Sequence, residues 1–311
     1  METGALPVLN RLLVELEEKN GSRALGKDML SALKTTIDEF SGEKDCKALL
    51  HQLYSLHNLM LACRPRMAHV IHDLQALIIY LIAHKEAGAE EVKHFIDILY
   101  KESEEQLNET IDNALALFTE PKHLLLHSHS RTIRTLIDKL ATAKVRPIVY
   151  VAAQKTHKTD KIIVDLDRAG IEHHVVSEYS IVHILDKLDL AIFGALTLNN
   201  NEEVILSPGS GGLISLLQQY NVEVYAILTR NKFSYWREQT ESAYKEVRQK
   251  SLSGIDYEKM VFSHDVVSLN LITGIIADEK IYTPDETRAE YDRRQNEFLE
   301  HEHVIKELEG K

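Results

Sequence analysis

Short apolar runs alternate with segments of helical spacing in the part of the chain that follows Pro121, and this alternation restricts the possible folds most strongly. The runs cover 124–126, 148–151, 172–176, 190–193, 204–206 and 222–228. Segments of helical spacing separate several of them, at 133–143, 160–169, 181–187 and 213–220. Because apolar strands joined by helices form parallel sheets covered on both faces, this part predicts a Rossmann-like α/β unit.

The chain before Pro121 has a different pattern. From about residue 6 to 118, apolar residues recur with helical spacing, interrupted by Gly21, Gly42 and a turn at 87–89. Helices are expected there over 46–61, 65–85, 90–101 and 104–118, among others. We therefore predict the α/β class, with an N-terminal helical domain over 1–120 and a Rossmann-like parallel sheet flanked by helices over 121–311. The highly charged segment 286–311 predicts an exposed helix.

Composition and charge exclude several classes of function. The net charge is −12, from 36 basic and 48 acidic residues, which argues against a general nucleic-acid binder. Cys46 and Cys63 have neither metal-ligand spacing nor the pattern of a disulfide framework, so a reducing setting is expected. The start of the chain has no signal-peptide pattern, and the longest apolar run, 74–83, is too short to span a bilayer. We expect a cytoplasmic protein without membrane contact.

Ligands on a parallel sheet bind beyond the carboxyl ends of its strands. The loops expected to surround such a crevice are 127–131, 153–159, 194–196, 207–212 and 229–233. Among these, Ser207–Gly212 is the best candidate for a phosphate site, because small residues and the N–H groups of a following helix admit an anion. The segment is neither a Walker loop nor a G-x-G-x-x-G fingerprint. A turn that simply requires glycine is the alternative interpretation.

Several further segments follow one another in a characteristic order: His127-Ser128-His129 after a strand, Ser177–Ser180 before Lys187-Leu188-Asp189-Leu190, Phe193-Gly194-Ala195, the glycine-rich loop, Asn231-Lys232-Phe233, and Asp265 ahead of Leu271-Ile272-Thr273 and Ile281-Tyr282-Thr283-Pro284. Over roughly 121–295 this order resembles the family that unites the alpha, beta and delta subunits of eukaryotic translation initiation factor 2B with ribose-1,5-bisphosphate isomerase and methylthioribose-1-phosphate isomerase. The resemblance implies a homodimer formed through the C-terminal region.

The resemblance also bears on catalysis. In the isomerases a cysteine and an aspartate are thought to move protons between two sugar carbons, which requires a positioned acid and base. The matching positions here hold Ser128 and Leu196, and 152–155 replaces an acidic-Ser-Arg-Pro run with one residue fewer. The inherited proton-transfer groups are therefore absent, and we assign no catalytic residue. His127 and His129 remain possible replacements, since imidazole titrates near pH 7 and the two positions share a strand face.

Anion binding survives this comparison better than catalysis. Besides the glycine-rich loop, Arg131, Arg230 and Lys232 follow expected strand ends, and arginine can grip a phosphate in a bidentate manner. A solvated surface role is the alternative for each cation. Asp265 is expected to contribute to the site or to the dimer contact, as in the family, or to cap a helix over 268–276. The candidate ligand-binding residues are Ser128, His129, Arg131, Ser207, Gly209, Ser210, Gly211, Gly212, Arg230, Lys232 and Asp265.

These expectations define a function and its alternatives. The leading hypothesis is a non-catalytic protein of the initiation factor 2B type that binds a sugar phosphate or nucleotide and contacts related subunits. It needs no cofactor and no metal, because two histidines lack a third ligand. The first alternative is an aldose–ketose sugar-phosphate isomerase whose acid–base pair has moved to His127, Ser128 or His129. The second is a structural oligomerising subunit without a ligand.

Overall fold

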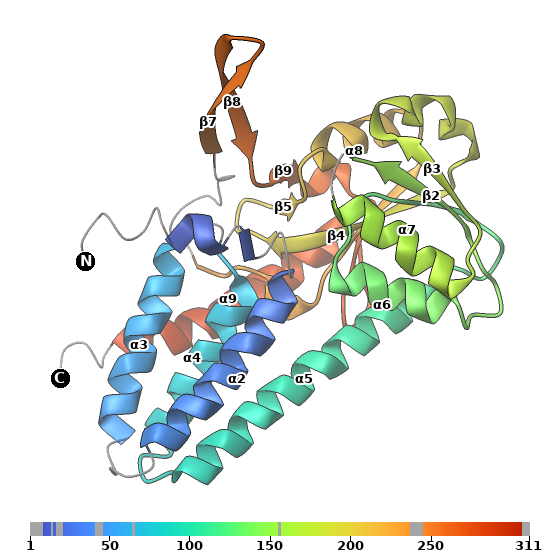
Figure 1. Ribbon diagram of the computed structural model, residues 1–311. Helices are drawn as coiled ribbons and strands as arrows, with labels where there is room; N and C mark the ends of the chain where they lie inside the picture. Colours follow the sequence, from blue (N-terminus) through green and yellow to red (C-terminus); the bar gives the residue numbers. More distant parts are fainter. Residues whose placement is uncertain are drawn as a thin grey trace.

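The computed structural model describes residues 9–13, 15–16, 21–40, 46–63, 66–154, 157–236 and 245–306. Its N-terminal part contains α2 (Ser22–Phe40), α3 (Cys46–Ala62), α4 (Ala68–Ala83) and α5 (Ala89–Leu115), which lie side by side (Figure 1). In α4, apolar residues occur all around the helix, and Leu74, Leu77 and Ile78 are fully buried. A helix of this kind belongs in the centre of a bundle.

The long helix α5 differs from the prediction. Separate helices were expected over 90–101 and 104–118, yet one continuous helix covers the first segment and the second as far as Leu115. Neither Glu102 nor Ser103 breaks a helix as proline or glycine would, so the backbone hydrogen bonds continue across them. As a result α5 extends from the helical part to the edge of the α/β part, where Asn113 donates to the carbonyl oxygens of Ala277 (2.8 Å) and Asp278 (3.2 Å).

The Rossmann-like prediction is confirmed. A central sheet has the order β11-β10-β6-β4-β1-β2-β3. Its parallel strands are β1 (His123–Leu126), β2 (Ile148–Ala153), β3 (His173–Ser177), β4 (Leu190–Leu198), β6 (Glu223–Ile227) and β10 (Gly274–Ile276), and β11 (Ile281–Tyr282) is antiparallel at one edge. Because successive side chains alternate between faces, Leu124 and Leu126 pack with α6 (Arg131–Leu140) and α7 (His157–Ala169), whereas Leu125 joins the core on the opposite face.

That opposite core is continuous with the interior of the helical bundle. It also receives α8 (Ser210–Gln219) and α9 (Pro284–Lys306). Although its sequence is highly charged, α9 buries Tyr291, Phe298 and Ile305, so the tail is a helix with one packed side rather than a fully exposed one. The residues after 306 lie outside the described part. The division into domains 1–120 and 121–311 stays a prediction.

Three local expectations are wrong. Residues 194–196 were expected in a loop, but β4 continues to Leu198 because β5 (Glu203–Leu206) folds back antiparallel to it. The expected helix at 181–187 consists of the short 3₁₀ turns η1 (Glu178–His183) and η2 (Leu185–Lys187). The segment 268–276 holds the 3₁₀ turn η4 (Leu269–Leu271) and then β10, because the β-branched pair Ile275-Ile276 pairs with β6.

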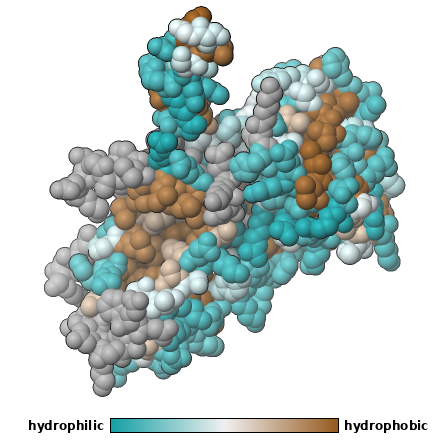
Figure 2. Space-filling model, viewed as in Figure 1, coloured by the Kyte–Doolittle hydropathy of each residue, from teal (hydrophilic) through white to brown (hydrophobic). Residues whose placement is uncertain are grey.

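A long hairpin was not expected from the sequence. Strands β7 (Lys245–Leu252) and β8 (Ile255–Phe262) project from the body, and their turn places Ser253 and Gly254 at positive φ, as a two-residue hairpin loop requires (Figure 1). On the face seen in Figure 2, the hairpin is largely hydrophilic along its length and hydrophobic at its tip, and Val247, Tyr257, Met260 and Phe262 on its strands are exposed as well. At the tip, Leu252 and Ile255 are 67% and 69% exposed. Among the described helices, none is long and apolar enough to cross a bilayer.

Candidate anion-binding cavity

A cavity of about 480 Å³ lies at the carboxyl end of β1 and beside residues 194–196 of β4, between the α/β part and helix α2. Most of its wall comes from α6, α7 and the loop after β1, and α2 contributes Arg23. Six fixed cations reach the wall, against two carboxylates: Arg23, Arg131, Arg134, Lys158, Lys161 and Lys232 against Asp160 and Asp165. In a chain with a net charge of −12, this excess of positive charge gives the cavity the electrostatics of an anion site.

Arg131 lies at one rim of the cavity, as its position shortly after an expected strand end predicted. It follows Ser130, whose hydroxyl caps α6 by accepting the N–H of Ile133. The Arg131 Nη2 atom lies 3.0 Å from both carboxylate oxygens of Glu104, on α5. The charge of this arginine is therefore balanced from within the chain.

Lys232 forms part of the buried wall. It is 5% exposed, and its ammonium donates to the carbonyl oxygen of Ala195 at 3.2 Å. It belongs to the 3₁₀ turn η3 (Arg230–Lys232), which follows β6. A buried ammonium that donates to a backbone carbonyl is held in a fixed position, so the charge of Lys232 stays at the cavity wall.

His129 also reaches the cavity, and it forms a pair with an acid that the sequence did not indicate. Its Nε2 lies 2.9 Å from Asp165 Oδ2 on α7, and Asp165 also lies 3.0 Å from Arg168. Burial lowers the pKa of His129, and the hydrogen bond to Asp165 offsets this only in part. With Asp165 accepting, the neutral ring carries its proton on Nε2 and leaves Nδ1 as a potential base.

The two positions that resemble the isomerases' proton-transfer pair also line the cavity. The hydroxyl of Ser128 lies 2.8 Å from that of Ser207, and Leu196 lines the wall with an aliphatic side chain. A hydroxyl is a poor acid–base group near pH 7, and an isobutyl group exchanges no proton. Ser207 reaches the cavity although β5 is antiparallel, since β5 ends opposite Ala195, near the carboxyl edge of the parallel strands.

The rest of the glycine-rich loop faces a carboxylate of the chain itself. The N–H groups of Gly209 and Gly211 both donate to Asp265 Oδ2, at 3.0 and 2.8 Å. Asp265 lies on β9 (Asp265–Ser268), which pairs with β5, and it thus caps α8 rather than a helix over 268–276. The expected N-cap role at 268–276 is therefore wrong. An external phosphate would have to displace this carboxylate to reach the N–H groups of Gly209 and Gly211.

The remaining loop residues lie away from the cavity wall. The Ser210 hydroxyl lies 3.1 Å from His127 Nδ1, and Gly212 sits in the first turn of α8. His127 is buried, and its Nε2 lies 2.9 Å from Gln154 Nε2. His127 and His129 therefore have separate partners, because the strand ends at Leu126 and its alternation stops there. Within the described ranges, no group of three or more His, Cys, Asp or Glu side chains could hold a metal ion.

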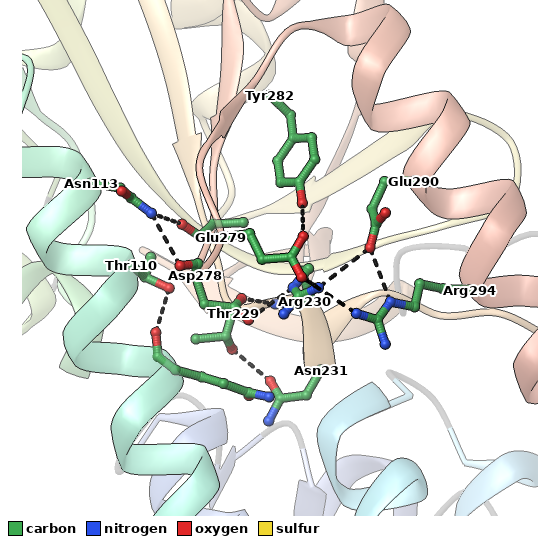
Figure 3. A network of polar contacts seen from close by, with 12 residues as sticks. Thr110, Asn113, Thr229, Arg230, Asn231, Asp278, Glu279, Tyr282, Glu290 and Arg294 are labelled. Atoms are coloured by element: carbon green, nitrogen blue, oxygen red, sulfur yellow. Dashed lines mark hydrogen bonds and ion pairs between the residues drawn. The ribbon is translucent and has the colours of Figure 1, made fainter.

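Arg230 is not part of the cavity wall. It lies in a polar network at the end of the sheet (Figure 3), where its Nε is 2.9 Å from Asp278 Oδ2 and its Nη1 contacts Glu279 and Glu290. Burial alone would lower the pKa of Arg230, but the carboxylates of Asp278 and Glu279 outweigh this and raise it. This geometry joins α9 to the sheet and gives Arg230 a structural part.

Several cavity residues were missed by the sequence analysis. Lys158 and Lys161 lie on α7, whose start falls in a loop that was expected at the crevice, so a positional signal existed for the first of them. Arg23 had none, because it comes from the helical part and reaches the cavity only through tertiary packing. The same holds for Asp165, the partner of His129.

Comparisons with known proteins agree with this architecture. The model of the Initiation factor 2 subunit family matches residues 18–284. Among solved structures, the Pyrococcus horikoshii OT3 translation initiation factor eIF-2B is 19% identical with a TM-score of 0.70, covering 88% of this chain and 96% of that one. The eIF2B beta of Chaetomium thermophilum is 15% identical with a TM-score of 0.66, and the shares covered are 93% and 92%. A chain of the tetrameric eIF2B-beta2-delta2 complex of C. thermophilum is 17% identical with a TM-score of 0.65, over 93% and 95%. No curated protein matches the sequence.

Proposed function

Because this chain belongs to the Initiation factor 2 subunit family, we propose that it is a non-catalytic protein of the initiation factor 2B type that binds a phosphorylated small molecule. The observation that carries the proposal is the cavity of about 480 Å³, with six cations and two carboxylates on its wall. Arginine and lysine groups of this kind suit phosphate oxygens, and the volume suits a sugar phosphate or a nucleotide.

The binding mode in this proposal rests on side chains rather than on the glycine-rich loop. Arg131, Lys232 and the α7 lysines place their positive charges at the cavity wall, and the N–H groups of Gly209 and Gly211, which lie away from it, bind Asp265. Of the ligand-binding residues expected from the sequence, Ser128, His129, Arg131, Ser207 and Lys232 make up the proposed site. Ser128 and Leu196, at the positions that match the isomerases' proton-transfer pair, support a protein that binds its ligand without isomerising it.

Protein contacts complete the proposal. The eIF2B beta and delta chains named above assemble with each other into a tetrameric complex. By analogy we propose a homodimer formed through the C-terminal region, contacts with related subunits, and a cytoplasmic location. These parts derive from the family and not from the cavity.

Isothermal titration calorimetry with ribose 5-phosphate, adenosine monophosphate and inorganic phosphate tests the site. The wild type should bind at least one phosphorylated compound, and Lys158→Ala/Lys161→Ala should weaken binding at least tenfold. Lys144→Ala/Lys187→Ala removes the same charge at exposed positions outside the cavity wall and should leave the affinity unchanged. Equal weakening by both pairs would indicate a net-charge effect and refute the site, and no binding at all would support a purely structural subunit.

One observation favours the isomerase alternative, namely the hydrogen-bonded pair of His129 and Asp165 at the cavity wall. A neutral imidazole oriented by a carboxylate is a common general base. Carbon-13 NMR of labelled ribose phosphates would detect aldose-to-ketose conversion. Turnover that His129→Ala or Ser128→Ala abolishes would replace the non-catalytic proposal with the enzymatic one.

A further inference from the structure

Glu104 balances two arginines at the same rim of the cavity. Its two carboxylate oxygens lie 3.0 Å from Arg131 Nη2, and its Oε1 lies 3.9 Å from Arg23 Nη2. Both arginines line the cavity, and Glu104 stands behind them on α5. The carboxylate is thus placed as a counter-ion to the pair that an incoming anion would meet.

Arg23 is not fully satisfied by this arrangement. It is 7% exposed, its Nη2 donates to the carbonyl oxygen of Ser103, and its Nε has no hydrogen-bond partner among the described residues. A buried guanidinium donor without an acceptor is costly, and structures normally supply one. Burial, opposed by Glu104 and reinforced by nearby Arg131, lowers the pKa of Arg23. The site therefore holds more positive charge and more donors than Glu104 alone can satisfy.

The Glu104–Arg131 contact is also accessible. The side chains are 30% and 35% exposed, so water can hydrate either group once the contact is broken. Releasing such a partly exposed ion pair costs little, in contrast to opening a fully buried one. A dianionic phosphate can therefore exchange with this carboxylate at Arg131 without leaving an unpaired buried charge behind.

We propose that Glu104 is a built-in competitor of the ligand, whose carboxylate occupies Arg131 until an anionic group of the ligand, held by Arg131 and Arg23, displaces it. This inference rests on the proposed anion-binding function and adds its regulation. Two consequences follow. Glu104 lowers the affinity of the cavity for every anion, and it favours dianionic phosphates over single carboxylates, which offer no more charge than Glu104 itself. Binding also releases α5 from its ion pair with the start of α6.

Calorimetric titration of the full chain with inorganic phosphate and with ribose 5-phosphate, at constant ionic strength, tests the proposal. Glu104→Gln should bind both at least fivefold more tightly than the wild type, since one competing charge is removed while the side chain keeps its length. Glu104→Asp keeps the charge but cannot reach Arg131 in the same way, so its affinity should fall between the two. Glu105→Gln, on the same helix and paired with Lys101, is the matched control and should be unchanged.

A double-mutant cycle separates competition from a general electrostatic effect. Arg131→Gln should weaken phosphate binding. Adding Glu104→Gln to this variant should raise its affinity by much less than fivefold, because the guanidinium for which Glu104 and phosphate compete is absent. A gain of the same size in both backgrounds would overturn the competitor role. Circular dichroism checks that each variant folds. If Glu104→Gln does not fold, Glu104→Asp tests the proposal instead, since it should bind phosphate more tightly than the wild type.

The outcomes distinguish this inference from the proposed function. If the wild type binds phosphate and Glu104→Gln binds equally or more weakly, Glu104 is an ordinary ion-pair partner between helices, and only the inference fails. If neither protein binds either compound, both fail. Phosphate should also raise the melting temperature of Glu104→Gln more than that of the wild type, whereas a purely structural ion pair predicts a lower melting temperature that phosphate does not restore.

Discussion

The carboxylate of Asp265 accepts the backbone N–H of Gly211 at 2.8 Å, and through the same oxygen it accepts that of Gly209 at 3.0 Å. The strand β9 thereby supplies, from 54 residues away, the anion that the start of α8 would otherwise draw from solvent. The N–H groups of the glycine-rich loop that could bind a phosphate therefore bind a carboxylate of the chain itself. The positive charge of the neighbouring cavity comes instead from arginine and lysine side chains.

From this contact we predict that Asp265→Ala lowers the free energy of unfolding by about 1–2 kcal/mol, because two N–H donors and the helix dipole lose their partner. Urea denaturation at pH 7 measures the change. Phosphate added to the variant should recover part of the loss, as the loop becomes free to bind an external anion. Asp256→Ala, at an exposed position of the hairpin, is the control and should change stability by less than about 0.5 kcal/mol. An equally stable Asp265→Ala variant would show that the cap contributes nothing.

Gly209 and Gly212 offer a matched pair in the same loop. Gly209 has φ of +93°, and a Cβ there would lie 2.3 Å from Glu178 Oε1 and 2.6 Å from Gln154 Nε2. Gly212 lies in the first turn of α8, and a Cβ there would meet nothing within 4 Å. We expect Gly209→Ala to cost about 1–3 kcal/mol and Gly212→Ala to be neutral or to stabilise by up to about 1 kcal/mol. Chemical denaturation of both variants in parallel would contradict this account if the two changes were equal.

The strands of the sheet could be predicted from the local sequence pattern, but the direction in which they pair could not. Apolar strands joined by helices predicted the sheet because strand burial is visible in any short window, as in 124–126 and 190–193. The position of Ser207 at the cavity was also predicted, but on the assumption of a parallel strand, whereas β5 returns antiparallel along β4. A window of four residues contains no information about the direction of pairing.

The contacts that decide the character of the cavity come from distant parts of the chain. Arg23 and Ser103 are 80 residues apart, and His129 and Asp165 are 36 apart. No periodicity or motif connects such pairs. Arg23, Ser103 and Asp165 lie on helices and His129 lies in the loop after β1, and none of these local patterns depends on the distant partner. Asp265 was identified as a functional candidate, yet its partner, the start of α8, could be found only from the pairing of β5 with β9.

The network around Arg230 (Figure 3) gives a prediction about stability rather than binding. The side chains of Arg230 and Asp278 are 15% and 0% exposed, so removing the guanidinium leaves a buried carboxylate without its cation. We expect Arg230→Ala to reduce the free energy of unfolding by about 3 kcal/mol or more while phosphate affinity stays within twofold. Arg248→Ala, an arginine on the exposed hairpin, is the control for charge removal. Loss of phosphate binding in a folded Arg230→Ala protein would instead assign Arg230 to the ligand site.

His57 predicts how stability depends on pH. It is 2% exposed inside the helical bundle, and burial, together with nearby His72, lowers its pKa from 6.5 to about 4. The folded state therefore keeps this ring neutral while the unfolded state takes up a proton below pH 6.5. The resulting stability is fully present above pH 6.5 and is lost as the pH falls from 6.5 toward 4.

Replacing His57 with leucine, which is similar in volume and does not titrate, should remove this dependence. We expect the advantage of His57→Leu over the wild type to grow by up to about 1.4 kcal/mol for each pH unit between 6.5 and 4. Urea denaturation at several pH values measures the difference between the two proteins. His183→Gln, at an exposed position of η1, serves as the control and should follow the wild type. A constant difference between His57→Leu and the wild type from pH 7 to pH 4.5 would mean that the imidazole is protonated equally in both states.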